Sequence, residues 1–238
     1  MPVLVLILAL TFAASPFWVP DFGGFEGDQF PVPQIDPPVQ PAGYAFAIWG
    51  VIYLWLLVGA GFGALKRWSA PDWAPMRAPL AVSLAVGSVW LPVAVQSAIW
   101  ATVLIWVMLI SALIALWRSP RLDGWAAAWP VGLYAGWLSA ASCVALGLLL
   151  AGYGWTSGRT AAWIMVTVAV VLALVVQRSL SRAPTYGVAV IWALIAVGVQ
   201  NGFDPRSVGA LAVLGAVIMI RPTIGAFREE NLSPRGQH

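Results

Sequence analysis

The chain has 238 residues, of which 61% are hydrophobic and only 9% are charged. Soluble domains carry roughly 25% charged residues, so this composition excludes a soluble fold of ordinary surface and predicts an all-α integral membrane protein whose surface faces lipid. The formal net charge is +3, but the basic residues are spread over short loops and form no patch, so we expect no nucleic-acid partner.

Eight apolar segments follow one another along the chain, and we predict that each forms a transmembrane helix. A helix that crosses about 30 Å of hydrocarbon needs around 20 residues, so the shorter segments are expected to be short helices or to share residues with the interfaces. In chain order the predicted spans are Val3–Trp18, Gly43–Leu65, Pro79–Val95, Ala98–Trp117, Trp129–Leu150, Ala161–Val176, Pro184–Val199 and Val208–Ile220.

The first segment has the apolar core and the small-residue end of a signal peptide. No basic residue precedes that core, so we expect the segment to be retained as the first helix. The loop at residues 19–42 holds four acidic residues and no basic residue, and five prolines between Pro31 and Pro41 predict an extended, stiff backbone there.

The basic residues predict the orientation of the chain in the membrane. With a cytoplasmic N-terminus, ten of the twelve fall in cytoplasmic loops and only Arg159 and Arg206 fall outside. The ten are Lys66, Arg67, Arg77, Arg118, Arg121, Arg178, Arg182, Arg221, Arg228 and Arg235. The positive-inside rule therefore predicts a multi-pass protein of a bacterial inner membrane, with both termini cytoplasmic and a short polar tail at residues 229–238.

Side chains that perform acid–base, metal or covalent chemistry are almost absent from the predicted spans. The single histidine is His238, the single lysine is Lys66, and no Asp or Glu falls within a span. We therefore expect no enzyme activity, no metal site and no covalent cofactor. The single cysteine, Cys143, is expected to be a small buried side chain.

The chain contains 15 tryptophans. Most lie near the predicted interfaces, as aromatic belts do. Trp55, Trp106, Trp137 and Trp192 fall near mid-membrane, where they either pack between helices or line a cavity.

Glycines on the second and fifth segments predict close helix packing, either within the bundle or at a homodimer face. They are Gly59, Gly61 and Gly63 on the second segment, and Gly132 and Gly136 on the fifth.

Three stretches, in order, resemble the tryptophan-rich sensory protein family, which includes TspO and the mitochondrial translocator protein. The first is the proline-rich loop followed by PAGYAFAIWGVIY, residues 41–53, in which Trp49 and Tyr53 are four residues apart. The second is Trp90, and the third is PVGLYAGW, residues 130–137. The resemblance covers roughly residues 1–150 and implies a five-helix bundle there. Residues 151–228 would form three additional helices, as in longer, eight-helix relatives.

What the resemblance implies is a site beneath the loop at residues 19–42 for an apolar, often planar ligand, such as a porphyrin or other tetrapyrrole, a lipid or a sterol-like molecule. Seven aromatic residues are expected to form this ligand-binding site and to converge on one cavity or one tightly packed cluster: Tyr44, Phe46, Trp49, Tyr53, Trp90, Tyr134 and Trp137. Gly87 and Ala145 stand where the family carries asparagines, so binding would depend on ring stacking and buried apolar area.

Three functions remain open from the sequence. The first is a non-catalytic membrane binding or sensory protein for such a ligand, with a possible link to transport. The second is an accessory subunit of a larger membrane complex, such as a pigment–protein complex, in which tryptophans pack against the partner. The third is a facilitative carrier of a neutral solute.

Overall fold

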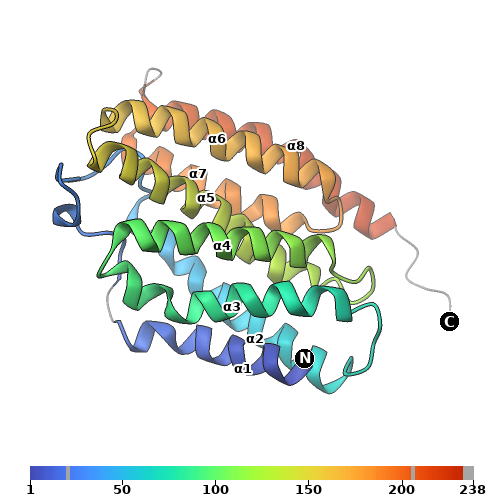
Figure 1. Ribbon diagram of the computed structural model, residues 1–238. Helices are drawn as coiled ribbons and strands as arrows, with labels where there is room; N and C mark the ends of the chain where they lie inside the picture. Colours follow the sequence, from blue (N-terminus) through green and yellow to red (C-terminus); the bar gives the residue numbers. More distant parts are fainter. Residues whose placement is uncertain (20–21, 205–206, 233–238) are drawn as a thin grey trace.

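The computed structural model describes residues 1–19, 22–204 and 207–232, with the backbone alone for 230–232. Within these ranges all regular secondary structure is helical, which confirms the predicted all-α class. The eight α-helices run side by side along one axis (Figure 1). They are α1 Pro2–Ala14, α2 Ile48–Leu65, α3 Ala74–Ala94, α4 Ala98–Trp117, α5 Ala128–Gly152, α6 Gly158–Ser179, α7 Pro184–Asn201 and α8 Val208–Leu232.

Three 3-10 helices accompany them: η1 Ser15–Phe17 continues α1, η2 Gly27–Gln29 lies in the long loop, and η3 Gly43–Ala47 leads into α2. Seven helical segments of the described chain, counting η3 with α2, are long and apolar enough to cross a membrane. The remaining segment, Pro2–Phe17, is equally apolar but shorter. Its length agrees with the expectation that some helices are short.

Several helices extend beyond their predicted ends. Helix α3 begins at Ala74 rather than Pro79, because Pro75 lies in the first turn, where no intrahelical N–H is lost. Helix α8 continues through Pro222 to Leu232 rather than ending near Ile220. The first residues of the predicted polar tail are therefore helical, and residues 233–238 lie outside the described part.

Helix α5 is the centre of the bundle and packs against α2, α4, α6 and α7. Nearly every residue between Ala128 and Cys143 is buried. The glycines of α5 allow α7 to approach closely, since a Cβ added at Gly136 would lie 2.3 Å from the carbonyl oxygen of Tyr186. Gly132 and Gly136 therefore serve packing inside the chain, and they are not available to a homodimer face.

Buried hydroxyl pairs fix α5 against two of its neighbours. The phenol of Tyr134 is 2.9 Å from the Ser83 hydroxyl of α3, and the phenol of Tyr186 on α7 is 2.9 Å from the Ser139 hydroxyl of α5. Each pair satisfies polar groups that lipid could not.

The remaining helices complete a single apolar core that runs from α1 to α8. Helix α1 packs against both α2 and α3, while α8 packs against α6 and α7. The packing is thus continuous across residue 150, where the resemblance to shorter relatives ends.

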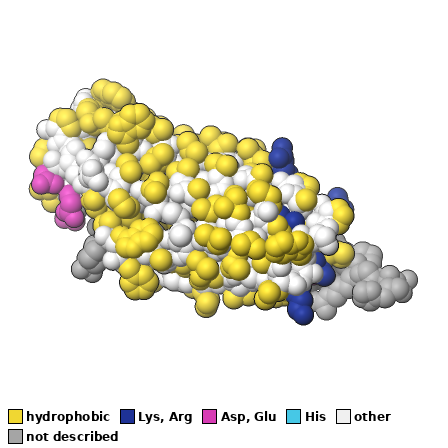
Figure 2. All heavy atoms as spheres, turned by 60° about the horizontal axis from the view of Figure 1, so that its bottom comes forward, with side chains coloured by type: hydrophobic (Ala, Val, Ile, Leu, Met, Phe, Trp, Pro, Cys, Tyr) yellow, Lys and Arg dark blue, Asp and Glu magenta, His cyan; other side chains and the backbone are white. Residues whose placement is uncertain are grey.

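The two ends of the bundle differ in charge. Figure 2 shows Lys and Arg side chains at one end and Asp and Glu side chains at the other. The loop at residues 22–42 lies at the acidic end, and the α2–α3, α4–α5 and α6–α7 connections lie at the basic end. The arrangement groups the loops as the distribution of basic residues predicts; Asp21, Arg206 and Arg235 lie outside the described residues.

Candidate functional site

A cavity of about 80 Å³ lies beneath the long loop. Side chains of α5, α6 and α7 form most of its wall, with Trp90 of α3 and Ile105 of α4. Its roof is formed by two pieces of the loop: Phe22, Gly24, Phe25, Val39, Gln40 and Pro41. Its lining residues carry four polar side-chain groups: the amide of Gln40, the thiol of Cys143 and the indole N–H groups of Trp90 and Trp137. The cavity surface is nonetheless almost wholly apolar.

Three of the seven predicted site residues line this cavity: Phe46, Trp90 and Trp137. The rings of Phe46 and Trp137 meet edge to face, with centroids 5.8 Å apart. Trp90 is held by a 2.8 Å hydrogen bond from Nε1 to the carbonyl oxygen of Ala101, and its ring meets Phe22 of the roof at 5.4 Å. These aromatic side chains are positioned by contacts within the chain and need no ligand to orient them.

Three further predicted residues form a packed cluster beside the cavity. Trp49 and Tyr53, one helical turn apart on α2, stack with centroids 5.3 Å apart. Phe12 of α1 contacts Tyr53 at 5.0 Å and Tyr134 at 5.5 Å. Trp137 belongs to both groups, since it lies 6.2 Å from Trp49 and also lines the cavity.

Tyr44 does not join this arrangement, so the expectation that all seven residues converge is wrong for this position. Its side chain is 46% exposed and meets Trp192 of α7 edge to face at 5.5 Å. The reason is local: residues two apart in a 3-10 helix point in different directions, so Tyr44 and Phe46 of η3 cannot face the same cavity.

Hydrogen bonds attach the roof to the ends of three helices. The Val32 N–H donates to the Gly152 carbonyl of α5 at 2.8 Å. The Asn201 amide of α7 donates to the Pro38 carbonyl at 2.8 Å. The Gln29 amide donates to the last carbonyls of α3 at 3.0 Å. The loop is thus a structured roof with its own attachment points.

The contribution of α6 and α7 to the cavity has no counterpart in the predicted site. These helices supply Met165, Val166, Ala169, Ala193, Leu194 and Val197. No local signal identifies them, because Ala, Val, Leu and Met occur throughout the apolar helices and only tertiary packing decides which of them face inward.

The mid-membrane tryptophans are all used within the chain. Trp137 lines the cavity, and Trp106 packs against the core. Trp55 donates from Nε1 to the Trp125 carbonyl at 2.7 Å, and Trp192 donates to the Ala45 carbonyl at 3.0 Å. Both alternatives raised by the sequence, packing and cavity lining, therefore occur.

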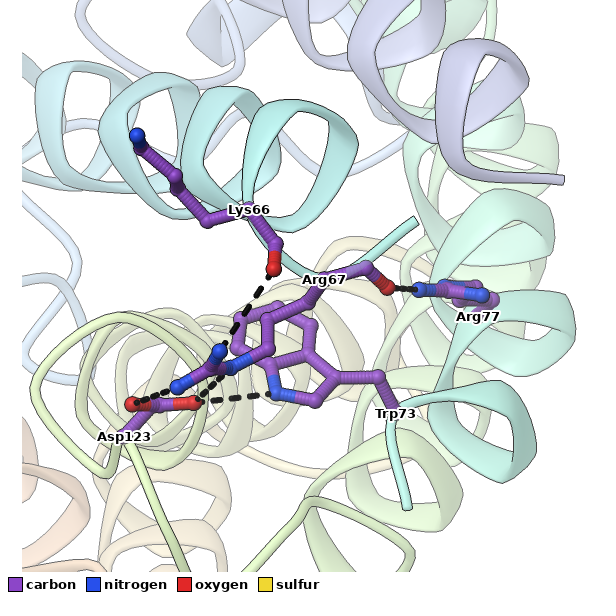
Figure 3. A network of polar contacts seen from close by, with 5 residues as sticks. All are labelled: Lys66, Arg67, Trp73, Arg77 and Asp123. Atoms are coloured by element: carbon purple, nitrogen blue, oxygen red, sulfur yellow. Dashed lines mark hydrogen bonds and ion pairs between the residues drawn. The ribbon is translucent and has the colours of Figure 1, made fainter. Parts of the chain in front are cut away.

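A polar network lies at the basic end of the bundle, and Figure 3 shows its residues. Asp123 accepts two hydrogen bonds from the Arg67 guanidinium, at 2.6 and 3.1 Å, and one from the Trp73 indole at 3.4 Å. Arg77 donates to the carbonyls of Arg67 and Trp68. This network joins the α2–α3 and α4–α5 connections.

The network offers no free acid or base, since its carboxylate is paired with a guanidinium. Among the side chains of residues 1–19, 22–204 and 207–229, no group of three His, Cys, Asp or Glu is close enough to hold a metal ion. The cavity beneath the loop has room for a small apolar group.

These features define a helical multi-pass membrane protein with an apolar cavity beneath a structured loop. A family model described as TSPO-like protein matches residues 32–224, and the chain belongs to this family. The match confirms the resemblance drawn from residues 41–53 and 130–137. It also extends past residue 150 into α8, so the helices beyond the first five lie within the family match. No curated protein and no solved structure matches the chain.

Proposed function

We propose that this chain is a non-catalytic membrane protein that binds an uncharged apolar molecule in the cavity beneath the loop. The family indicates a membrane binding or sensory role in broad terms. The observation that supports the finer proposal is the cavity itself, which combines a lining of apolar side chains with five aromatic rings. Ligand sites are concave and mostly apolar, with few polar groups.

The size of the cavity limits what it holds in the observed conformation. Its volume is about 80 Å³, whereas sites for drug-sized ligands have roughly 300–1,000 Å³. A small apolar molecule, or one part of a larger one, fits the cavity in this conformation. A tetrapyrrole or a sterol-like molecule requires the roof to move, and the roof is the part attached by individual hydrogen bonds.

The charge around the roof favours a neutral ligand. The roof loop carries Glu26, Asp28 and Asp36, all exposed, and Arg159 is the one basic residue described at this end. A tetrapyrrole with ionised carboxylates would meet like charge at the entrance and no cation among the residues that line the cavity. We therefore expect neutral molecules to bind better than their anionic counterparts of the same shape.

Protoporphyrin IX and its dimethyl ester provide a direct comparison, because they share one ring and differ in charge. Their quenching of tryptophan fluorescence would be titrated in the same detergent, together with a neutral fluorescent sterol. We expect the ester and the sterol to bind more tightly than the free acid. Tighter binding of the free acid would contradict the neutral-ligand assignment.

Filling the cavity tests its location. Ala193 is 3% exposed and lines the cavity, so Ala193→Leu should abolish most of the sterol binding. Ala85→Leu, at an exposed position on α3, is the matched control and should bind as the wild type does. Equal binding by both variants would place the ligand elsewhere. Isolation in a stable complex with another protein, with no ligand bound, would instead favour the accessory-subunit hypothesis.

A further inference from the structure

The basic ends of α4 and α6 are tied together by polar contacts. The Trp117 indole donates to the Ser179 hydroxyl at 3.3 Å. Arg182, in the connection from α6 to α7, donates from Nη2 to the carbonyls of Trp117 and Leu116 at the end of α4, at 2.5 and 3.4 Å. The last turns of two helices, one on each side of α5, therefore meet at this corner.

Four arginines lie in this junction or close to it along the chain. Arg118 directly follows Trp117, Arg178 directly precedes Ser179, and both are exposed, as is Arg121. Arg121 is close enough to Arg182 to act on it: burial first, and then the positive charge of Arg121, lower the pKa of Arg182. Like charges are thus brought together here at an electrostatic cost.

No described carboxylate forms an ion pair with any of these four arginines. Asp123, in the same region, is paired with Arg67 instead. Arg77 at the same end is likewise satisfied, by the backbone carbonyls of Trp68 and Arg67, of which Figure 3 shows the second. In contrast, Nε of Arg182 is buried without a hydrogen-bond partner, which is an uncommon state for a buried donor.

The helix ends reduce the positive charge but do not cancel it. The C-terminus of an α-helix carries roughly half a negative charge, so α4 and α6 together offset about one of the four positive charges. About three remain at the basic end of the bundle. Trp117 beside them is 44% exposed, and Ile110 of α4 and Val175 of α6 expose apolar side chains farther along the same helices.

We infer that this corner, formed by Arg118, Arg121, Arg178 and Arg182 with Trp117, binds the phosphate headgroup of an anionic membrane lipid. The arginines supply the charge and the donors that a phosphate accepts. The exposed apolar side chains of the two helices supply the surface along which its acyl chains lie. Basic pockets between helices at the cytoplasmic face recognise lipid headgroups in this way. The site is separate from the cavity and does not depend on what the cavity binds.

Phosphatidylglycerol titrated into the detergent-solubilised full chain tests the site, with native mass spectrometry counting the bound lipid and thermal unfolding as a second readout. The test variant is Arg121→Gln with Arg178→Gln, since both side chains are exposed and neither holds the helix ends together. The control is Lys66→Gln with Arg221→Gln, which removes two exposed positive charges elsewhere.

Each arginine near an anionic lipid contributes about fivefold in affinity, so we expect about 30-fold weaker phosphatidylglycerol binding by the test variant. The control should bind within a few-fold of the wild type. Phosphatidylcholine and inorganic phosphate should each stabilise the wild type less than phosphatidylglycerol does. The proposed site would be contradicted by an equal loss of phosphatidylglycerol affinity in the test and control variants. It would also be contradicted by equal stabilisation of the wild type by the two lipids. Equal stabilisation by inorganic phosphate would show that the corner binds a free anion and not a lipid headgroup.

Discussion

Glycine residues in this bundle have two different roles, which can be distinguished by the space available for a Cβ atom at each position. An added Cβ at Gly136 would lie 2.3 Å from the Tyr186 carbonyl oxygen, which belongs to the backbone of α7 and cannot turn away. At Gly61, in the interior of α2, no atom lies within 4 Å of the added Cβ. The first glycine sets a distance between helices, and the second does not.

We therefore expect Gly136→Ala to destabilise the protein by about 1–3 kcal/mol, the usual cost of overpacking. Gly61→Ala should be neutral or stabilising by up to about 1 kcal/mol, because alanine has the higher helix propensity. Thermal unfolding of both variants in one detergent, followed by tryptophan fluorescence, measures the difference. If the two variants unfold at the same temperature, α5 and α7 do not approach as closely as the structure indicates.

Tyr44 and Trp49 show how far single residues can be predicted. Trp49 and Tyr53 are four apart, and a helix brings such residues together whatever surrounds it; they stack as expected. Tyr44 lies in a 3-10 helix that the apolar pattern does not distinguish from the first turn of α2. Residues two apart point in different directions in either kind of helix, so with Phe46 facing the cavity the ring of Tyr44 lies against Trp192 instead.

At the scale of elements, the loop at residues 22–42 and helix α7 act together. Asn201 donates one hydrogen bond to the Pro38 carbonyl of the roof and another to the Val197 carbonyl of its own helix. The roof can move away from the cavity only if such attachments break, at about 1 kcal/mol each.

We expect Asn201→Ala to loosen the roof while the bundle stays folded. Hydrogen–deuterium exchange should increase in peptides covering residues 22–41 and remain unchanged in peptides of α5. Gln96→Ala is the matched control, because the Gln96 amide bonds only to the Pro92 carbonyl of its own helix. Increased exchange throughout the bundle would contradict a local attachment.

The connections at the basic end are joined by the Arg67–Asp123 pair, and Asp123 has a left-handed backbone with φ of 60°. Asp123→Asn keeps a residue that tolerates this conformation and removes the charge. We expect a lower midpoint of thermal unfolding for this variant. The difference from the wild type should shrink at high salt, because the Arg67 side chain is 40% exposed.

The stability contributed by the Arg67–Asp123 pair should not vary with pH through titration of Arg67. The hydrogen bond to Asp123 raises the pKa of Arg67 above its ordinary value. A group whose pKa is raised in the folded state stabilises the fold at every pH below its unfolded-state pKa. This stabilisation is lost only as the pH rises through the folded-state pKa. Between about pH 6 and pH 9 the contribution of Arg67 is therefore expected to be constant. A midpoint difference that varies across this range would point to another titrating group.

On the scale of the whole molecule, the sequence predicted the class of fold more fully than the site. The order of eight helices follows from apolar runs separated by polar loops, which need no knowledge of packing. The cavity depends on which faces of α5, α6 and α7 turn toward one another. The sequence does not indicate that alanines such as Ala169 and Ala193 line it. The resemblance directed attention to residues 1–150, whereas α6 and α7 form part of the cavity wall.

Orientation in the membrane is the property of the whole molecule that follows most directly from charge. Lys66, Arg121 and Arg182 lie at one end of the bundle, and Glu26 and Asp36 lie at the other, as Figure 2 shows for the two kinds of charge. Basic loops are retained on the cytoplasmic side during insertion. We therefore expect the roof and the entrance to the cavity to face away from the cytoplasm.

Single cysteines at Asp36 and Lys66, both exposed, test this orientation in intact cells. A maleimide that does not cross membranes should label Asp36→Cys directly and Lys66→Cys only after permeabilisation. The native thiol of Cys143 is buried, so the wild type should stay unlabelled and serves as the control. Labelling of Lys66→Cys alone before permeabilisation would show that the protein has the opposite orientation in the membrane. Labelling of both would require an even number of crossings between the two positions, which the single passage through α2 does not allow.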